Sequence, residues 1–259
     1  MSGLAYESAR RVTAYASVVL AANPGLMTLD GTNTWILREP GSSSSIVVDP
    51  GPDDEIHLAA VRAEAGHVAA ILLTHGHPDH SAGARRLAEL TGAGVRALDP
   101  AHRLGEEGLG EGDVVAAGGV ELRVWATPGH SSDSLSFLLG EADPAVLTGD
   151  TILGRGTTVV AYPDGDLADY LGSLRRLAQL GELTVLPGHG PELAAAGVVA
   201  RAYLAHRQQR LQQVRDALAV LGPDADARAV VERVYADVDT ALWPAAEVSV
   251  RAQFAYLGR

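Results

Sequence analysis

One short segment, residues 74–80, constrains the fold and the chemistry of this chain more than any other. It reads Thr-His-Gly-His-Pro-Asp-His and places four potential metal ligands, His75, His77, Asp79 and His80, within six positions. An apolar run at residues 69–73 leads directly into it, which predicts that the ligands follow the end of a buried strand. Imidazole and carboxylate groups at this density are typical of a protein metal site.

Three later positions each place one more candidate ligand just after an apolar stretch. They are His130 in a Thr-Pro-Gly-His turn, Asp150 after Leu-Thr-Gly, and His189 in a Pro-Gly-His-Gly turn. The ends of strands in a layered α/β fold gather at one edge, where loops that are distant in sequence converge on a ligand. We therefore expect one site at that edge, built from seven side chains.

These seven side chains predict a pair of metal ions. His75 and His77 stand two residues apart and, in an extended loop, point the same way toward one ion, whose ligand set His130 would complete. The expected ligands of the second ion are Asp79, His80 and His189. Asp150 is expected to bridge the two ions through its carboxylate. We expect two Zn²⁺ ions, with Mn²⁺ or iron as alternatives, because imidazole and oxygen ligands discriminate poorly among first-row ions.

A metal pair of this kind predicts hydrolysis. Two ions about 3.5 to 4 Å apart hold a hydroxide between them and stabilise the charge that develops on an attacked phosphorus or carbonyl. The catalytic residues are then the ligands of the segment itself, His75, His77, Asp79 and His80. The chain contains no cysteine, so thiolate ligands and disulfides are excluded.

Short apolar runs and helical patterns alternate over most of the chain and predict a layered α/β fold. Strands are expected at residues 17–21, 34–37, 46–48, 69–73, 120–126, 134–139, 145–147 and 183–186, and helices at residues 53–65, 80–90 and 167–180. After Pro191 the pattern becomes helical, at residues 193–221, 226–235 and 245–257. We expect a catalytic domain at residues 1–195 and a small all-helical domain at residues 196–259.

The chain is acidic, with 20 basic residues against 32 acidic ones and a net charge of −12. This charge is unfavourable for a nucleic-acid partner, because affinity for a phosphate backbone comes largely from basic residues. Several arginines, Arg207 among them, lie on the longest predicted helix. We interpret them as a solvated helix face rather than as a strip that binds substrate. No apolar run approaches a membrane span of about 20 residues, and the chain does not begin with a signal-peptide pattern. We expect a cytoplasmic location and no membrane partner.

Several other polar residues receive structural interpretations. His57, His67, His102 and His206 are interpreted as core or surface residues whose rings are satisfied by hydrogen bonds. Asp49 follows an apolar run and is interpreted as a residue that orients the ligand loops, with a plain turn-forming role as the alternative.

The segment at residues 75–80, followed in order by His130, Asp150 and His189, resembles the metallo-β-lactamase superfamily. The likeness covers roughly residues 1–195. It implies a four-layer αββα sandwich with a dinuclear site at one edge, and it gives the metal roles to the same seven side chains. A role in β-lactam hydrolysis is not expected, because the antibiotic-hydrolysing members with two zinc ions typically use a cysteine ligand.

Within the superfamily, residues 23–34, 154–158 and 187–191 and the His206-Arg207 pair resemble the β-lactamase-like protein 2 group, over nearly the whole chain. That group ends in a winged-helix-like module, and its characterised animal members cut single-stranded RNA as endonucleases. The resemblance places Asn33 near the site, where a turn-capping role is the alternative. Arg207 is a candidate substrate residue, since an arginine grips either a phosphate or a carboxylate.

Three functions remain open, because fold alone does not choose among them. The leading one is a phosphodiesterase, an endoribonuclease that acts on single-stranded nucleic acid through a metal-bridged hydroxide. The second is a glyoxalase II-like thioesterase, or another ester or lactone hydrolase, since that group shares the ligand pattern and also carries a helical tail. The third is a non-catalytic nucleic-acid-binding protein on the same scaffold. The expected partner is a small-molecule ester or single-stranded RNA, and the oligomeric state is not predicted.

Overall fold

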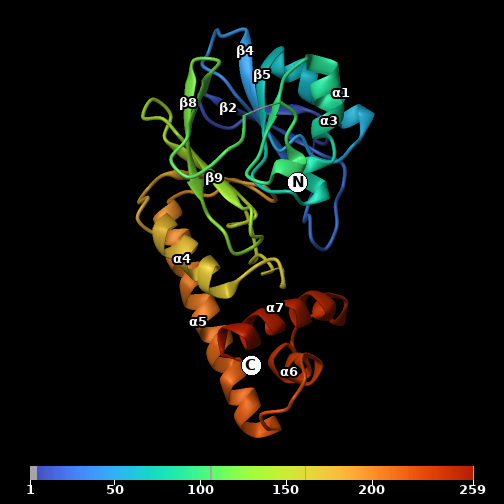
Figure 1. The fold of residues 1–259 in the computed structure, drawn as a ribbon, viewed down its shortest axis with the longest axis vertical. Coiled ribbons are helices and arrows are strands. Elements are labelled where there is room, and N and C mark those ends of the chain that lie inside the picture. Colours follow the sequence, from blue (N-terminus) through green and yellow to red (C-terminus); the bar gives the residue numbers. More distant parts are fainter. Residues whose placement is uncertain (1–4, 106, 161, 259) are drawn as a thin grey trace.

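The computed structural model describes residues 5–105, 107–160 and 162–258 and shows two β-sheets packed face to face (Figure 1). The first sheet contains, in spatial order, β1 (Ala9–Arg11), β2 (Ala16–Leu20), β3 (Asn33–Leu37), β4 (Ser44–Val48), β5 (His67–Leu72) and β6 (Val95–Arg96). The second contains β11 (Thr184–Pro187), β10 (Ala145–Gly149), β9 (Leu135–Leu139), β8 (Val120–Ala126) and β7 (Val114–Ala117). The pairs β4–β5, β5–β6 and β10–β11 are parallel, and the other neighbours are antiparallel.

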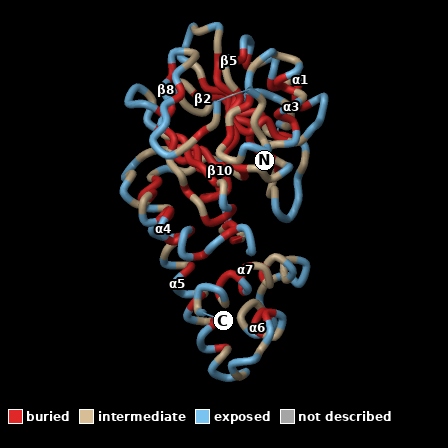
Figure 2. Tube along the Cα trace, in the orientation of Figure 1, coloured by how far each residue is buried: buried red, intermediate tan, exposed pale blue. Residues whose placement is uncertain are grey.

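The main core lies between the two sheets. Trp35 and Leu72 of the first sheet pack in one buried cluster with Val124, Phe137 and Leu147 of the second. Nearly every residue of β3, β4 and β10 is buried, whichever face of the sheet its side chain is on, because helices cover the outer face of each sheet. In Figure 2 the buried residues, drawn in red, gather in the interior of the sandwich.

Helices complete the four layers. The helices α1 (Glu55–Ala65) and α3 (Ala84–Thr91) pack Leu58 and Leu87 against the outer face of the first sheet. The helix α4 (Leu167–Leu177) and the first turns of α5 (Ala196–Leu221) pack against the second sheet through Leu174 and Ala200. The order helix, sheet, sheet, helix confirms the expected αββα sandwich.

The helical tail extends from one end of the sandwich (Figure 1). It consists of α5, α6 (Ala227–Val234), the 3₁₀ helix η2 (Thr240–Leu242) and α7 (Trp243–Tyr256). Val214, Val230 and Val250 form its own small buried cluster. Described residues 196–258 form helices and no strand, as expected for an all-helical tail. The first half of α5 packs with the sandwich, so α5 belongs to both cores, and the division of the chain at residue 195 stays a prediction.

Two short helices complete the inventory. The helix α2 (Pro78–Ser81) begins within the ligand segment, and the 3₁₀ helix η1 (Pro100–His102) follows β6. In the part of the chain that the structure describes, none of the helices combines the length and the apolar character that crossing a lipid bilayer requires.

Candidate metal centre

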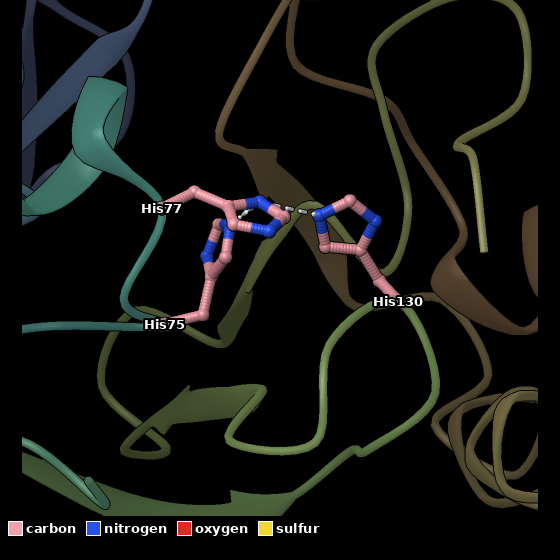
Figure 3. A group of neighbouring side chains, drawn as sticks. All are labelled: His75, His77 and His130. Atoms are coloured by element: carbon pink, nitrogen blue, oxygen red, sulfur yellow. Dashed lines mark hydrogen bonds between the residues drawn. The ribbon is translucent and has the colours of Figure 1, made fainter. Parts of the chain in front are cut away.

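The first three candidate ligands converge in space. The chain leaves β5 in an extended loop and enters α2 at Pro78, whose fixed φ suits the first position of a helix. Nε2 of His75 lies 3.0 Å from Nδ1 of His77, and Nε2 of His130 lies 3.1 Å from the same atom. Figure 3 shows the three rings pointing toward one another from two separate loops.

The remaining four candidates form the other half of the same cluster. Nε2 of His189 lies 3.2 Å from Nε2 of His80 and 3.1 Å from Oδ2 of Asp79. Asp150 lies between the two halves, with Oδ1 3.4 Å from His80 and Oδ2 3.4 Å from His189 and 3.8 Å from His130. The structure therefore brings together all seven side chains that were expected to share one site.

The geometry and chemistry of this cluster fit metal ions. Three groups of three side chains each place their donor atoms within 4.8 Å of one another, and Asp150 belongs to one of them. Oδ1 of Asp150 is buried and makes no hydrogen bond with any residue that the structure describes. Gly188 leaves room beside the cluster, since a Cβ there would lie 2.7 Å from Oδ1 of Asp150 and 2.7 Å from Cε1 of His80. A buried carboxylate oxygen without a donor is costly unless a cation or proton faces it.

Burial and mutual charge set the protonation of the cluster. Burial lowers the pKa of His75 well below its ordinary value and also lowers the pKa of His130. For His80, burial opposes protonation, but Asp150 and Asp49 outweigh it and raise the pKa. Burial likewise opposes ionisation of Asp150, yet His189 and His80 hold the pKa of Asp150 well below its usual range. These directions favour an ionised Asp150 and neutral rings at His75 and His130, the states that metal ligation requires. The raised pKa values of His80 and His189 favour their protonated rings, which would have to release a proton when a cation binds.

Asp49 stands directly behind the cluster. Its Oδ2 accepts hydrogen bonds from Nδ1 of His80 at 2.9 Å and from Oγ1 of Thr74 at 2.7 Å, and its Oδ1 accepts one from the backbone N–H of Thr74 at 2.7 Å. Asp49 is 1% exposed. These bonds tie the ligand segment to the end of β4 and turn Nε2 of His80 toward the other ligands.

Asn33 holds the loop that carries His189. Its side-chain amide donates to the carbonyl oxygens of Pro187 at 3.0 Å and Gly190 at 2.8 Å, and these two residues flank the turn that carries His189. The carbonyl oxygen of Gly31 lies 3.1 Å from Nδ1 of His189. Asn33 therefore lies beside the site as expected, and its side chain holds the His189 turn rather than capping its own.

Thr158 is a site residue that the sequence analysis missed. Its Oγ1 lies 3.1 Å from Nδ1 of His130, whose ring also contacts the carbonyl oxygen of Val159 at 2.6 Å. The guanidinium of Arg207 donates to the carbonyl oxygen of Thr158. The Gly-Arg-Gly-Thr-Thr run around Thr158 was visible in the sequence, but it carries no metal-ligand pattern that would have indicated this role.

A cavity of about 410 Å³ opens onto the cluster at His77, Asp79, His130 and Asp150. Its other walls come from three distant segments: the loop with Leu26 and Met27, the loop at residues 153–159, and the tail. Most of the surface that lines it is apolar, and its basic members outside the cluster are His206, Arg155, Arg207 and Arg210. The tail therefore closes one side of the site.

The histidines outside the cluster were expected to have rings satisfied by hydrogen bonds, and the structure agrees for some of them. Nδ1 of buried His57 contacts Glu7 at 2.7 Å and its Nε2 contacts Thr34 at 2.8 Å, so this ring is satisfied within the core. His67 contacts the Ser44 hydroxyl at 3.2 Å. His102 packs beside Gly76 of the ligand segment. For His206 the expectation is wrong, because its Nδ1 is buried and has no hydrogen-bond partner in the described part of the chain, and the residue lines the cavity.

A second correction concerns the arginines of α5. Arg201 and Arg215 are exposed, as a solvated helix face requires. Arg207 is only 8% exposed and lines the cavity, and Arg210 lines it half-buried. The solvated-face interpretation is wrong for Arg207, because the loop at residues 153–159 docks against this side of the helix.

Comparison with known proteins agrees with this geometry. A family model described as Metallo-beta-lactamase superfamily matches residues 27–189. A Caenorhabditis elegans protein named beta-lactamase-like protein 2 homolog is 32% identical over 230 residues, which cover 85% of this chain and 76% of that protein. An Aspergillus fumigatus protein named atrochrysone carboxyl ACP thioesterase is 36% identical over 212 residues, or 77% of this chain. The chain spans 64% of the length of that thioesterase.

Solved structures share the fold. A beta-lactamase domain protein from Burkholderia ambifaria superposes with a TM-score of 0.81 at 23% identity, over 99% of this chain and 91% of that one, so the likeness includes the helical tail. The protein TTHA1623, solved in a di-iron-bound form, superposes with a TM-score of 0.56 at 29% identity, over 70% of this chain and 96% of that one.

Proposed function

The chain belongs to the metallo-beta-lactamase superfamily of metal-dependent hydrolases, and from this premise we propose that it hydrolyses a small carboxylic ester or thioester with an apolar acyl group. The observation that carries this proposal is the cavity of about 410 Å³, whose lining surface is mainly apolar, that opens onto the cluster of seven candidate ligands. Cavities of this size and character suit small-molecule ligands.

The proposed site holds two divalent cations. His75, His77 and His130 would hold one, the remaining histidines with Asp79 would hold the other, and Asp150 would bridge them, with Zn²⁺ as the first expectation and iron or Mn²⁺ as alternatives. When bound, such ions lower the pKa of a coordinated water and polarise the scissile carbonyl. The di-iron form of TTHA1623 supports a pair of ions and keeps iron among the candidates.

The protein's own residues prepare this chemistry. Asp49 and the Thr158 hydroxyl contact the outer nitrogens of His80 and His130, which leaves the inner nitrogens free to bind cations. The apolar walls around Leu153 and Val159 exclude water from the acyl group and place its carbonyl next to the cluster. The exclusion of water strengthens each electrostatic contact that the carbonyl makes there.

The size and charge of the protein favour an acyl substrate over a nucleic acid. A single strand needs a basic channel along its backbone, whereas here the tail covers one side of the site and the net charge is −12. The Aspergillus fumigatus relative, which is named as a thioesterase, lends support to the same choice at 36% identity.

The second candidate is hydrolysis of phosphodiesters in single-stranded RNA. The observation in its favour is that Arg155, Arg207 and Arg210 all line the cavity, because arginine is well suited to phosphate. The third candidate, non-catalytic nucleic-acid binding, receives no support from a complete set of clustered ligands.

Parallel assays of metal-loaded protein test the proposal. The panel contains N-acetylcysteamine thioesters, aryl esters and a lactone on one side, and fluorescent single-stranded RNA on the other. We expect turnover of thioesters or esters and none of RNA, and we expect the Asp79→Ala variant, as a guard against contaminating enzymes, to be inactive. Cleavage of RNA without turnover of any acyl substrate would reverse the order of the two candidates.

A further inference from the structure

Two arginines of α5 line the cavity without an acidic partner. Arg207 and Arg210 are one helical turn apart and therefore share a face of α5. Within the described ranges, neither guanidinium lies within ion-pair distance of a carboxylate. Arg155, in the loop at residues 153–159, differs because it pairs with Asp30.

Arg207 is held rigidly in the wall. One of its terminal nitrogens donates to the carbonyl oxygen of Thr158, and its guanidinium lies 5.2 Å from the centre of the Tyr170 ring. Its Nε is buried and has no hydrogen-bond partner among residues 5–105, 107–160 and 162–258. The side chain lines the cavity, is only 8% exposed and keeps an unused donor within the wall.

Arg210 is supported in a similar way. Its NH1 donates to Oε1 of Gln213 at 3.0 Å and to the carbonyl oxygen of Val234 at 3.1 Å, and its guanidinium lies 4.6 Å from the Tyr235 ring. These partners are neutral, so they fix the position of the charge without balancing it. Burial and the charges of Arg207 and Arg210 lower the pKa of the neighbouring His206 ring, so the positive charge of this wall comes from the two arginines.

A buried charge without a counter-ion costs free energy, and the cost falls when an anion enters and accepts its hydrogen bonds. The acidic side chains that line the same cavity are Asp79 and Asp150, and both belong to the proposed metal cluster. The fold therefore leaves the positive charge of the tail available to a ligand.

We propose that Arg207 and Arg210 form an anion subsite for the substrate, which would then carry a carboxylate or a phosphate as well as the scissile ester or thioester bond. The ester or thioester bond in this inference rests on the proposed function, whereas the anion subsite does not. Thr158 connects the two ends of the site, since its carbonyl contacts Arg207 and its hydroxyl contacts His130. Apolar side chains of the same cavity, such as Val159 and Leu153, suit an apolar segment between the anion and the scissile carbonyl.

Three thioesters test the subsite and separate its two ligand chemistries. Hexanoyl-N-acetylcysteamine is neutral, adipoyl-N-acetylcysteamine carries a carboxylate on the acyl side, and hexanoyl-phosphopantetheine carries a phosphate on the thiol side. We expect one of the two anionic thioesters to exceed the neutral one in kcat/KM by about tenfold or more, the size of one charge-assisted hydrogen bond. Equal kcat/KM values for all three would overturn the subsite while leaving the proposed function intact.

Variants identify the residues responsible. In Arg210→Gln and Arg207→Gln, the preference for the anionic thioester should fall about tenfold, mainly through KM. Arg215→Gln is the matched control, since it removes the same charge from an exposed position of the same helix outside the cavity. Arg210→Gln carries the test if the buried Arg207 variant unfolds. A preference that survives Arg210→Gln, or that falls equally in Arg215→Gln, contradicts the assignment.

Calorimetry provides a readout that does not depend on turnover. The full chain is titrated with phosphopantetheine and with pantetheine, and in parallel with adipate and with hexanoate. Each pair differs by one anionic group, so tighter binding of the more charged member of one pair, lost in Arg210→Gln, supports the subsite even if no thioester is cleaved. Equal dissociation constants within both pairs refute it. Failure of every acyl substrate with retained anion binding refutes the proposed function alone.

Discussion

The carboxylate of Asp49 accepts a hydrogen bond from Nδ1 of His80 at 2.9 Å, and both side chains are buried. A histidine that donates from Nδ1 presents Nε2 as its free nitrogen, so this bond aims His80 at the cluster. The same carboxylate also holds the hydroxyl and the backbone N–H of Thr74, one residue before His75. One side chain thus positions both ends of the ligand segment.

We expect Asp49→Asn to weaken metal binding by about 10- to 100-fold, the usual cost of losing an outer partner of a ligating histidine. The asparagine keeps the shape but loses the negative charge that stabilises the donating ring. Competition with a chromogenic chelator measures the change. Asp53→Asn, at an exposed position on the same loop, removes the same charge and should leave the metal affinity unchanged. Equal metal affinity in both variants would contradict the role of Asp49.

His75→Ala should abolish turnover because it removes a ligand at the centre of the cluster, 3.0 Å from His77 and in two of the three candidate ligand groups. The loss should exceed the roughly 100-fold cost of losing an outer partner. Circular dichroism should show an intact fold, since the cluster lies at a loop edge outside the apolar core. His67→Ala makes the same substitution at an exposed position of β5 and should keep full activity. Normal turnover of His75→Ala would refute the assigned site.

Gly188→Ala tests the space that the cluster needs. Its Cβ would lie 2.7 Å from both Oδ1 of Asp150 and Cε1 of His80, too close for any unshifted arrangement, so at least one proposed ligand must move. We expect fewer bound metal ions per chain by elemental analysis and a matching loss of activity. Gly172→Ala is the control, and we expect it to leave metal content and activity unchanged. It adds a Cβ at an open, exposed position of α4 and should stabilise the fold by up to about 1 kcal/mol.

The sequence was sufficient to locate the cluster but not the cavity around it. His75 to His80 follow a strand of strongly apolar residues, and local spacing placed them correctly. Arg207 could not be placed in the same way, because its burial depends on the loop around Thr158, 49 residues away in sequence, docking on α5. Helix periodicity records which residues are apolar, whereas Arg207 and His206 are polar side chains that tertiary packing buries. Thr158 was missed for the same reason.

The ion pair between Glu111 and Arg176 predicts a small loss of stability in acid. The Arg176 guanidinium holds the pKa of Glu111 below its usual range, so the pair stabilises the fold above the unfolded-state pKa of glutamate, about 4.3, and this contribution is lost as the pH falls through the lower folded-state value. Both side chains are substantially exposed, so the effect stays below about 1 kcal/mol.

Urea unfolding of Arg176→Gln and of the unmodified chain measures this effect. The variant should be less stable at neutral pH, and the pH-dependent part of the difference should vanish below about pH 3. A residual difference is expected at every pH, because Arg176 also lies 4.2 Å from the centre of the Trp125 ring and the substitution removes that contact. A gap between the two proteins that widens in acid would contradict the assigned sign.

Met27→Ser tests whether the exposed apolar loop contributes to substrate binding. Met27 is 53% exposed yet lines the cavity beside the proposed metal cluster, so its apolar surface gains most when an acyl group covers it. Loss of about 1 kcal/mol of apolar burial should raise KM for hexanoyl-N-acetylcysteamine about fivefold, and the thermal midpoint should stay constant because the side chain is not part of a core cluster. Ile56→Ser is the matched control, since it removes an even more exposed apolar side chain from α1, outside the cavity wall. An unchanged KM in Met27→Ser, or an equal rise in Ile56→Ser, would show that the loop does not contact the acyl group.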